Sequence, residues 1–227
     1  MLPASKYNEC RTVNSTKPWR SLLLVTCLSS VVPAAELVMR DIGVGVVRLP
    51  TDFSYDVSAP AGNRSGDDTF DSAYGIDVHG RYSMARTGDS LGLVLGGALG
   101  AEQAAYAPGG AWTAFTATGL AGCGWAITDR IILLGEAQVG LGLGQLEIDG
   151  SAAANSISVS GPLVRGGVQA SGRFALTESV IIGLGVGWLQ TMAPLSGDGV
   201  DTTLKISGTS AFLSLDWRLS DRPFLLE

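Results

Sequence analysis

Hydrophobic and polar residues alternate along most of the chain from Asp41 onward, with a dominant period of two residues. The segment 74–84 is the clearest example. Its apolar face carries Tyr74, Ile76, Val78, Tyr82 and Met84, and its opposite face carries Gly75, Asp77, His79, Arg81 and Ser83. Successive side chains of a β-strand point to opposite faces, so the pattern predicts amphipathic strands.

Eight strands of this kind are expected along the chain. They lie at about 42–57, 74–84, 90–104, 111–127, 131–143, 164–176, 180–192 and 210–219. Many of them reach the roughly 9–11 residues that a tilted strand needs to cross a bilayer, whereas no stretch reaches the roughly 18 apolar residues of a membrane-spanning helix. The pattern therefore favours an all-β, antiparallel up-and-down transmembrane β-barrel of eight strands.

Three five-residue segments repeat one order of residue types: an aromatic, any residue, an aliphatic, a hydroxyl residue and an acid. They are Trp125–Asp129, Phe174–Glu178 and Trp217–Asp221. The hydroxyl and the acid can bond their own backbone and so close a tight turn. The aromatic residue, three positions earlier, would lie in a girdle at the membrane interface. These segments predict short turns at one end of a barrel.

The other connections are mostly longer and rich in Gly, Ser, Asp and Pro: 58–72, 106–110, 149–155 and 193–201. Short turns at one end and longer polar loops at the other are typical of outer-membrane barrels. We expect the loops 58–72 and 193–201 to offer the contact surface for an extracellular ligand.

These strands, turns and loops resemble the small bacterial outer-membrane barrels of the OmpA transmembrane-domain and opacity-protein type. The resemblance covers about Asp41 to Leu219 and is specific for architecture. It implies a protein of the outer membrane, with membrane lipid and the barrel-assembly machinery as partners. A soluble β-barrel or sandwich with its apolar face turned inward remains the alternative, because period two does not distinguish inside from outside.

Residues 1–35 have the features of a signal peptide, and 36–227 would form the barrel. Basic residues precede the apolar run 22–28, and Pro33-Ala34-Ala35 offers small residues for cleavage near Ala34 or Ala35. The segment 222–227 parallels the start of the strand near 130–136. A truncated ten-stranded barrel is therefore the alternative to eight strands.

Composition narrows the possible partners and chemistry. The formal net charge of −6 argues against nucleic acid, because phosphate binding needs clustered Lys and Arg. Removal of 1–35 would leave Cys123 as the single cysteine, so no internal disulfide is expected. One histidine and one cysteine do not supply the three or four ligands of a stable zinc site. We expect no metal and no cofactor.

Polar side chains on the strands project into the predicted lumen. They are Asp77, His79, Arg81, Glu136, Gln138, Arg165, Gln169, Arg173, Lys205, Asp216 and Arg218. Charges in such an interior are costly unless they are paired, so we expect a closed polar network with a structural role rather than a pore. Glu136 and Arg173 lie on neighbouring strands at similar height and form the first candidate pair.

The leading hypothesis is a non-enzymatic barrel with a structural or surface-interaction role. One alternative is a narrow channel for small solutes. A second alternative is a barrel enzyme, a lipid or peptide hydrolase that uses Asp77 and His79, because an Asp-x-His pair on a barrel strand resembles part of the site of the omptin proteases. Arg81 stands where a barrel lipid A deacylase would need a serine two residues after the histidine. No catalytic residue is therefore assigned.

Overall fold

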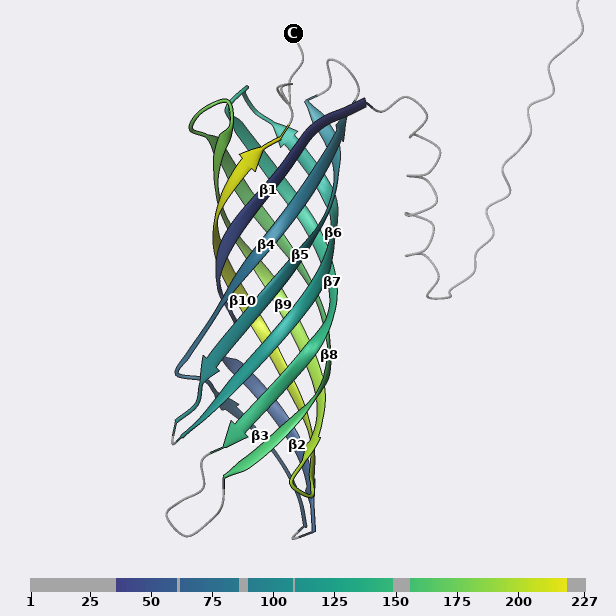
Figure 1. Ribbon diagram of the computed structural model, residues 1–227, viewed down its shortest axis with the longest axis vertical. Coiled ribbons are helices and arrows are strands. Elements are labelled where there is room, and N and C mark those ends of the chain that lie inside the picture. Colours follow the sequence, from purple (N-terminus) through teal and green to yellow (C-terminus); the bar gives the residue numbers. More distant parts are fainter. Residues whose placement is uncertain (1–35, 61, 86–89, 108, 149–155, 220–227) are drawn as a thin grey trace, which may run out of the picture. The chain divides into compact units, whose positions relative to one another are not determined.

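The computed structural model describes residues 36–219 except 61, 86–89, 108 and 149–155. Ten strands make up this part of the chain (Figure 1). They are β1 (Glu36–Arg48), β2 (Asp52–Ala59), β3 (Gly62–Thr69), β4 (Ser72–Ala85), β5 (Leu91–Ala105), β6 (Gly110–Ala126), β7 (Ile131–Ile148), β8 (Ile157–Ala175), β9 (Val180–Gly197) and β10 (Val200–Arg218). Within these residues, no helix is long and apolar enough to cross a membrane. The predicted signal peptide 1–35 and the segment 222–227 lie outside the described residues.

Eight of the strands form a closed antiparallel ring. The order is β1-β4-β5-β6-β7-β8-β9-β10, and β1 pairs with β10 from Asp41↔Arg218 to Arg48↔Ala211. Closure leaves no free edge in the ring, which is how a barrel avoids unpaired main-chain groups. The prediction of an eight-stranded up-and-down barrel is confirmed, and the ten-stranded ring does not form.

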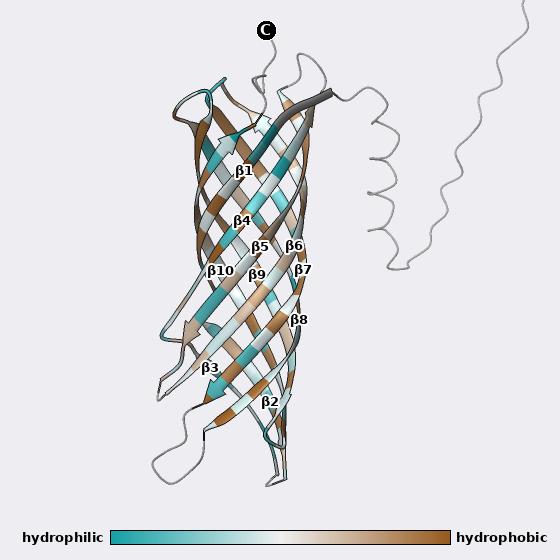
Figure 2. Ribbon diagram, in the orientation of Figure 1, coloured by the Kyte–Doolittle hydropathy of each residue, from teal (hydrophilic) through white to brown (hydrophobic). Residues whose placement is uncertain are grey.

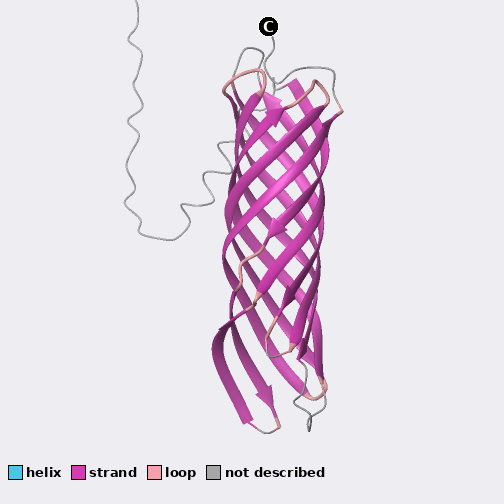
Figure 3. Cartoon of the chain, turned by 90° about the vertical axis from the view of Figure 1, so that its left-hand side faces the viewer, coloured by secondary structure: helices cyan, strands magenta, loops and turns pink. Residues whose placement is uncertain are grey.

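The segment 58–72 was predicted as a long loop, and that prediction is wrong. Most of it continues as a hairpin of β2 and β3, which extends the sheet in the order β10-β2-β3. β2 pairs with the part of β10 that lies beyond β1, from Phe53↔Ile206 to Ser58↔Asp201. Polar residues that indicate a loop can form strands here because they hydrogen-bond to an existing sheet. Figure 3 shows this hairpin beside the lower end of the barrel wall.

The segment 193–201 is likewise mostly strand instead of a loop. β9 and β10 pair as far as Val200↔Gly197, and Asp198-Gly199 connects them. Both connecting residues have positive φ, 49° and 74°, as a two-residue hairpin turn requires. The connection 106–110 is also tight, with Gly109 N–H donating to Tyr106 O at 3.0 Å. The predicted loop 149–155 lies outside the described residues.

In the short turns at the opposite end of the barrel, the hydroxyl residue bonds the backbone and closes the turn, as predicted. Thr128 Oγ1 accepts hydrogen bonds from the N–H groups of Arg130 (3.2 Å) and Ile131 (3.1 Å). Thr177 Oγ1 accepts from Ser179 (3.2 Å) and Val180 (3.0 Å) in the same way. The third predicted turn extends past Leu219, outside the described residues. We call this end, at the top of Figure 1, the periplasmic end, because short turns face the periplasm in such barrels.

The outer wall of the ring carries a broad apolar surface, here named the lipid-facing belt. Its side chains are one-third or more exposed and include Val44, Ile76, Val78, Leu99, Phe115, Trp125, Val139, Leu141, Leu143, Val164, Val168, Phe174, Leu184, Val186, Trp188, Leu213, Leu215 and Trp217. A water-soluble protein does not expose an apolar patch of this size. On β6 the belt runs from Phe115 to Trp125, close to the roughly 9–11 residues that span a bilayer. The wall therefore faces lipid.

Beyond the belt, the apolar and polar faces of the strands exchange places. On β7 the outward side chains up to Leu143 are apolar, but the next outward residues are Gln145 and Glu147, while Leu146 points inward and is buried. Figure 2 shows the alternation of hydropathy along the ring strands. The exchange follows from the solvent, since water surrounds this part of the barrel and an apolar interior becomes favourable there.

Two apolar clusters therefore lie inside the barrel. The extracellular core consists of Leu49, Phe53, Phe70, Ala73, Ala104, Trp112, Ala114, Leu146, Val159, Leu163, Leu189, Ala193, Leu195, Leu204 and Ile206. The periplasmic cluster consists of Val94, Ala126, Ile132, Leu134, Ala175 and Ile181. Along β7, Ile132 and Leu134 are followed by Glu136 and then by Leu146. A polar section thus lies between the two clusters.

Because the apolar face of β9 changes from outward to inward along the strand, a leucine-to-alanine substitution should lower the free energy of unfolding by different amounts at its two ends. Leu195 is 1% exposed inside the extracellular core, so Leu195→Ala should leave a cavity and lower the free energy of unfolding by about 2–5 kcal/mol. Leu184 is 66% exposed in the lipid-facing belt, so Leu184→Ala should cost less because detergent or lipid fills the space. Equilibrium unfolding in micelles measures both. Equal losses would contradict the assigned faces.

Candidate functional site

The polar section between the clusters forms the candidate site, here named the lumen network. The ring strands direct its side chains inward by simple alternation, and most are buried: Asp41, His79, Arg81, Glu102, Glu136, Arg165, Arg173 and Asp216. Asp77, Gln138, Gln169 and Arg218 are partly exposed and face the same interior. Of the eleven residues assigned to the lumen from the sequence, ten therefore face this interior and Lys205 does not.

His79 bridges two carboxylates in the lumen network. Its Nδ1 lies 2.5 Å from Asp77 Oδ1, and its Nε2 lies 2.5 Å from Asp216 Oδ1. An ionised carboxylate only accepts hydrogen bonds, so both ring nitrogens must donate, and the ring then carries a positive charge. The ring is only 5% exposed, which leaves neither nitrogen available to another molecule.

Glu136 pairs with Arg81 on β4. Arg81 Nε donates to Glu136 Oε1 at 2.9 Å and its Nη2 donates to Oε2 at 3.3 Å, while Gln169 Nε2 donates to Oε2 at 2.8 Å. The predicted pair of Glu136 with Arg173 is wrong. The lumen of an eight-stranded barrel is narrow, so the long Arg81 side chain crosses it to a strand that is not its neighbour.

Arg173 instead joins two carboxylates from β1 and β10. Its Nη1 donates to Asp41 Oδ2 at 2.8 Å, and its Nη2 lies 3.2 Å from Asp216 Oδ2. Asp216 also accepts a hydrogen bond from Ser214 Oγ at 2.9 Å. Asp216 thus connects the pairs of His79 and Arg173 at the seam where β1 and β10 close the ring.

A further ion pair lies nearer the extracellular core. Arg165 on β8 donates from both terminal nitrogens to the two carboxylate oxygens of Glu102 on β5, and its Nε donates to Thr191 Oγ1 at 3.0 Å. Bidentate pairing of this kind is the strong form of an arginine–carboxylate contact. It satisfies two charges that are 8% exposed each.

The sequence prediction missed Asp41 and Glu102 and misplaced Lys205. Asp41 lies just before the predicted strand 42–57, whose alternation is less clear. Extending a strict period of two back from Gly43 would have placed the Asp41 side chain inward. Glu102 follows Ala98 and Gly100 on the inward face of β5 in the same way. Lys205 points outward, because inward Leu204 and Ile206 belong to the extracellular core, and its Nζ lies 3.5 Å from Asp56 Oδ2.

Gly43 and a small cavity complete the interior. A Cβ atom at Gly43 would overlap Asp216 Oδ1 and His79 Nε2, so only glycine allows the two side chains to meet there. Next to the network lies a cavity of about 80 Å³, lined by residues that include His79, Glu102 and Arg165. A polar cavity of this size has room for a few ordered waters.

The charges in the described part of the lumen balance. Five carboxylates face four guanidinium groups and His79; they are Asp41, Asp77, Glu102, Glu136 and Asp216 against Arg81, Arg165, Arg173 and Arg218. The total is zero when His79 is protonated, in agreement with its two carboxylate contacts. Among the described residues, no group of three or more His, Cys, Asp and Glu side chains is arranged to hold a metal ion.

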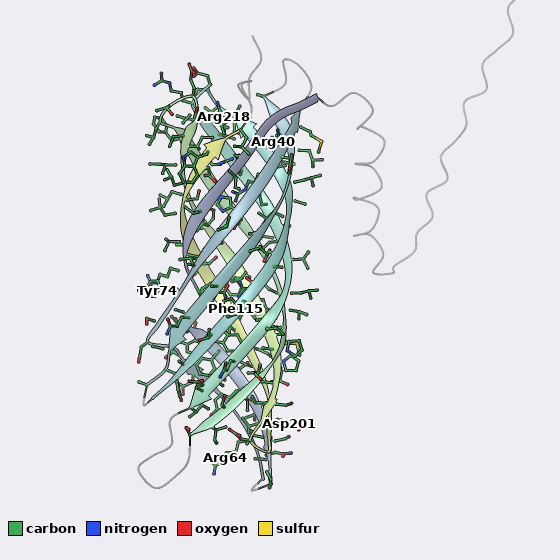
Figure 4. The ribbon with its side chains drawn as sticks, in the orientation of Figure 1. Arg40, Arg64, Tyr74, Phe115, Asp201 and Arg218 are labelled. Atoms are coloured by element: carbon green, nitrogen blue, oxygen red, sulfur yellow. The ribbon has the colours of Figure 1, made fainter. Side chains whose placement is uncertain are left out.

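The strands beyond the belt, together with β2 and β3, form what we name the extracellular extension. Figure 4 labels Arg64 and Asp201 there, Tyr74 and Phe115 midway, and Arg40 and Arg218 at the periplasmic end. Acidic side chains outnumber basic ones by eight to three on its described exposed surface: Asp52, Asp56, Asp67, Asp68, Asp71, Glu147, Asp198 and Asp201 against Arg48, Arg64 and Lys205.

One hydrogen bond ties the hairpin to the turn between β5 and β6. Tyr106 Oη donates to Asp68 Oδ2 at 2.6 Å, and the Tyr106 ring packs edge-on against Phe53 of the extracellular core, with ring centroids 5.7 Å apart. This bond, followed by the Thr69 N–H, lowers the pKa of the Asp68 carboxyl. The same bond raises the pKa of the Tyr106 hydroxyl to about 12.

The closed antiparallel ring, its lipid-facing belt and its filled lumen define a small transmembrane β-barrel of the outer-membrane class. No protein-family model matches the chain, and no curated protein matches it in sequence.

Solved outer-membrane barrels are similar in fold at low identity. Ail, the attachment invasion locus protein of Yersinia pestis, is 15% identical with a TM-score of 0.39, over 81% of this chain and 100% of that one. OprG from Pseudomonas aeruginosa is 11% identical with a TM-score of 0.46, over 82% and 98%. The outer membrane protease OmpT from Escherichia coli is 10% identical with a TM-score of 0.42, over 82% and 98%. Similarities at this level assign neither a family nor a function.

The Glu102–Arg165 pair predicts a strong coupling. Glu102→Leu leaves a buried guanidinium without its carboxylate and should lower the free energy of unfolding by about 3–5 kcal/mol. The double variant Glu102→Leu/Arg165→Met should lose less than the sum of the two single variants, because no unpaired charge remains. A double-mutant cycle by equilibrium unfolding in micelles measures the coupling. Additive losses would show that the two side chains are not paired.

The Tyr106–Asp68 bond predicts a pH window for the contact. Asp68 contributes above its ordinary pKa of 3.8 and loses its contribution as pH falls through its lower folded value. Tyr106 contributes below its ordinary pKa of 10.0 and loses its contribution as pH rises through about 12. Tyr106→Phe should return the pKa of Asp68 toward 3.8, as an NMR titration of the carboxyl would show. An unchanged titration would mean that the bond does not form in solution.

Proposed function

We propose that this protein is a non-enzymatic, non-conducting barrel of the bacterial outer membrane that contacts a partner through its extracellular extension. Residues 1–35 would direct export and be removed near Ala34 or Ala35. The observation that carries the proposal is a lumen closed at three levels, combined with a sheet that continues into the water outside the membrane. A barrel with no passage through it can act mainly through its surface.

The closed lumen argues against the alternative of a narrow solute channel. A solute would have to pass the extracellular core, the lumen network and the periplasmic cluster in turn. Passage through the middle section would separate Arg81 from Glu136, and a single buried charge without its partner is strongly unfavourable. The cavity of about 80 Å³ beside them accommodates waters but lies between closed sections.

The same closure argues against a hydrolase that uses Asp77 and His79. Both nitrogens of His79 are occupied by carboxylates, and the extracellular core closes the lumen on the extracellular side of His79. A general base must reach the proton that it abstracts, either directly or through one water. The Asp77–His79–Asp216 contacts instead support a structural role, in which they hold β4 against the β1–β10 seam.

Planar bilayer recording tests the closed lumen. The purified protein should give no steady current, while a general porin in the same bilayers serves as positive control. The variant Arg81→Ser/Glu136→Ser should also remain closed, because both apolar clusters persist when the ion pair is gone. A steady ohmic current from the unmodified protein would overturn the proposal in favour of the channel. A current only from the variant would show that the ion pair alone is the barrier.

A further inference from the structure

One strand edge in this structure lies outside the closure of the ring. β3 pairs with β2 on one side, and the sheet order ends at β3. Every residue of β3 is exposed except Gly66, which is partly buried. A side-chain hydrogen bond between Tyr106 and Asp68 connects the strand to the turn between β5 and β6. β3 is therefore an accessible edge in water.

The register shows which main-chain groups of β3 are free. Phe70 N–H donates to Thr51 O across the hairpin at 2.9 Å, whereas Thr69 N–H turns away and donates to the Asp68 carboxylate at 2.8 Å. Alternate residues of an antiparallel strand direct both main-chain groups to the same side. Asp67, Ser65 and Asn63 lie two, four and six residues before Thr69, so they direct their N–H and C=O groups away from β2 as Thr69 does.

A groove crosses the outer face of the sheet from β10 over β2 to β3, the edge strand. It has a volume of about 400 Å³ and is lined by Asp52, Phe53, Ser54, Asp67, Asp68, Thr69, Lys205 and Ser207. Lys205 is already paired with Asp56 at 3.5 Å. Asp52 on β2 and Asp67 on β3 occupy diagonal positions, because Thr69 is opposite Asp52 and Ser54 is opposite Asp67. The groove therefore presents an excess of negative charge next to free main-chain groups.

We propose that the free edge of β3 binds an extended, basic segment of a partner protein by strand addition. Main-chain hydrogen bonds to Asn63, Ser65 and Asp67 would hold the segment, and its Lys or Arg side chains would lie against Asp67 and Asp52 in the groove. Addition of a strand to an exposed edge is a general mode of peptide recognition, in which the main chain supplies affinity and alternate side chains supply specificity. The inference rests on the proposed role of the extracellular extension as a contact surface.

Charge selects this occupant over a second copy of the chain. Acidic residues outnumber basic ones by eight to three on the described exposed surface of the extension, so two copies brought edge to edge would repel each other. Charged side chains along an edge strand also oppose pairing with identical strands. A basic segment is attracted to these acidic residues, and its side chains differ from those of β3.

The test uses the full-length protein in micelles and a labelled synthetic octapeptide of alternating Lys and Thr, with fluorescence anisotropy as the readout. Ser65→Pro removes one free N–H at the edge while leaving the groups that face β2, and Ser65→Ala is the matched control. The protein and Ser65→Ala should bind equally, and Ser65→Pro and Asp67→Lys should each weaken binding at least about tenfold. The same peptide with Glu in place of Lys should not bind.

Equal binding by Ser65→Pro and the unmodified protein would overturn strand addition and leave general charge attraction. Absence of peptide binding, with self-association that Ser65→Pro abolishes, would overturn the basic partner and identify a second copy. Heat-modifiable gel mobility checks that each variant folds. Should Ser65→Pro misfold, hydrogen exchange on the unmodified protein decides: the peptide should slow exchange at Asn63, Ser65 and Asp67, and unchanged exchange would overturn the proposal. The lumen is tested separately by conductance, so either proposal can fail alone.

Discussion

Pairing of every main-chain group at membrane depth is the constraint on which the rest of this structure depends. Hydrocarbon offers no hydrogen bonds, so an open sheet edge there would leave N–H and C=O groups unsatisfied. The pairing of β1 with β10 removes that edge. Closure with eight strands also sets the radius, and a ring of this size leaves room only for side chains. The lumen is therefore filled, and the charges that face it must find partners within it.

The change of solvent along the barrel explains its three interior sections. Where lipid surrounds the wall, apolar side chains point outward and the interior can be polar, as at Glu136 on β7. Where water surrounds the wall, Gln145 and Glu147 point outward and Leu146 is buried. In the extracellular extension the apolar side chains point inward, as in a water-soluble barrel, and in the membrane-spanning part they point outward. Because water satisfies main-chain groups, an unpaired edge such as β3 is tolerated only in that part.

Residue alternation predicted the strands, the turn hydroxyls of Thr128 and Thr177, and the inward direction of His79 and its neighbours. Each of these depends on a few consecutive residues. The partner of Glu136 could not be predicted from neighbouring strands, because Arg81 reaches across the lumen. The segments 58–72 and 193–201 have loop composition, and they form strands because β10 provides hydrogen-bonding partners. The prediction that Lys205 faces the lumen was wrong because the apolar and polar faces of the strands exchange places on the extracellular side of the belt.

The sequence by itself determined a set of amphipathic antiparallel strands, the turns at one end and most of the side chains that face inward. These properties follow from a period of two and from turn chemistry, which are local. Only the tertiary structure decided that eight strands close, which charges pair in the lumen, and that the β2–β3 hairpin leaves a free edge. Those outcomes depend on contacts between residues far apart in the chain, such as Asp41 with Arg173 and His79 with Asp216.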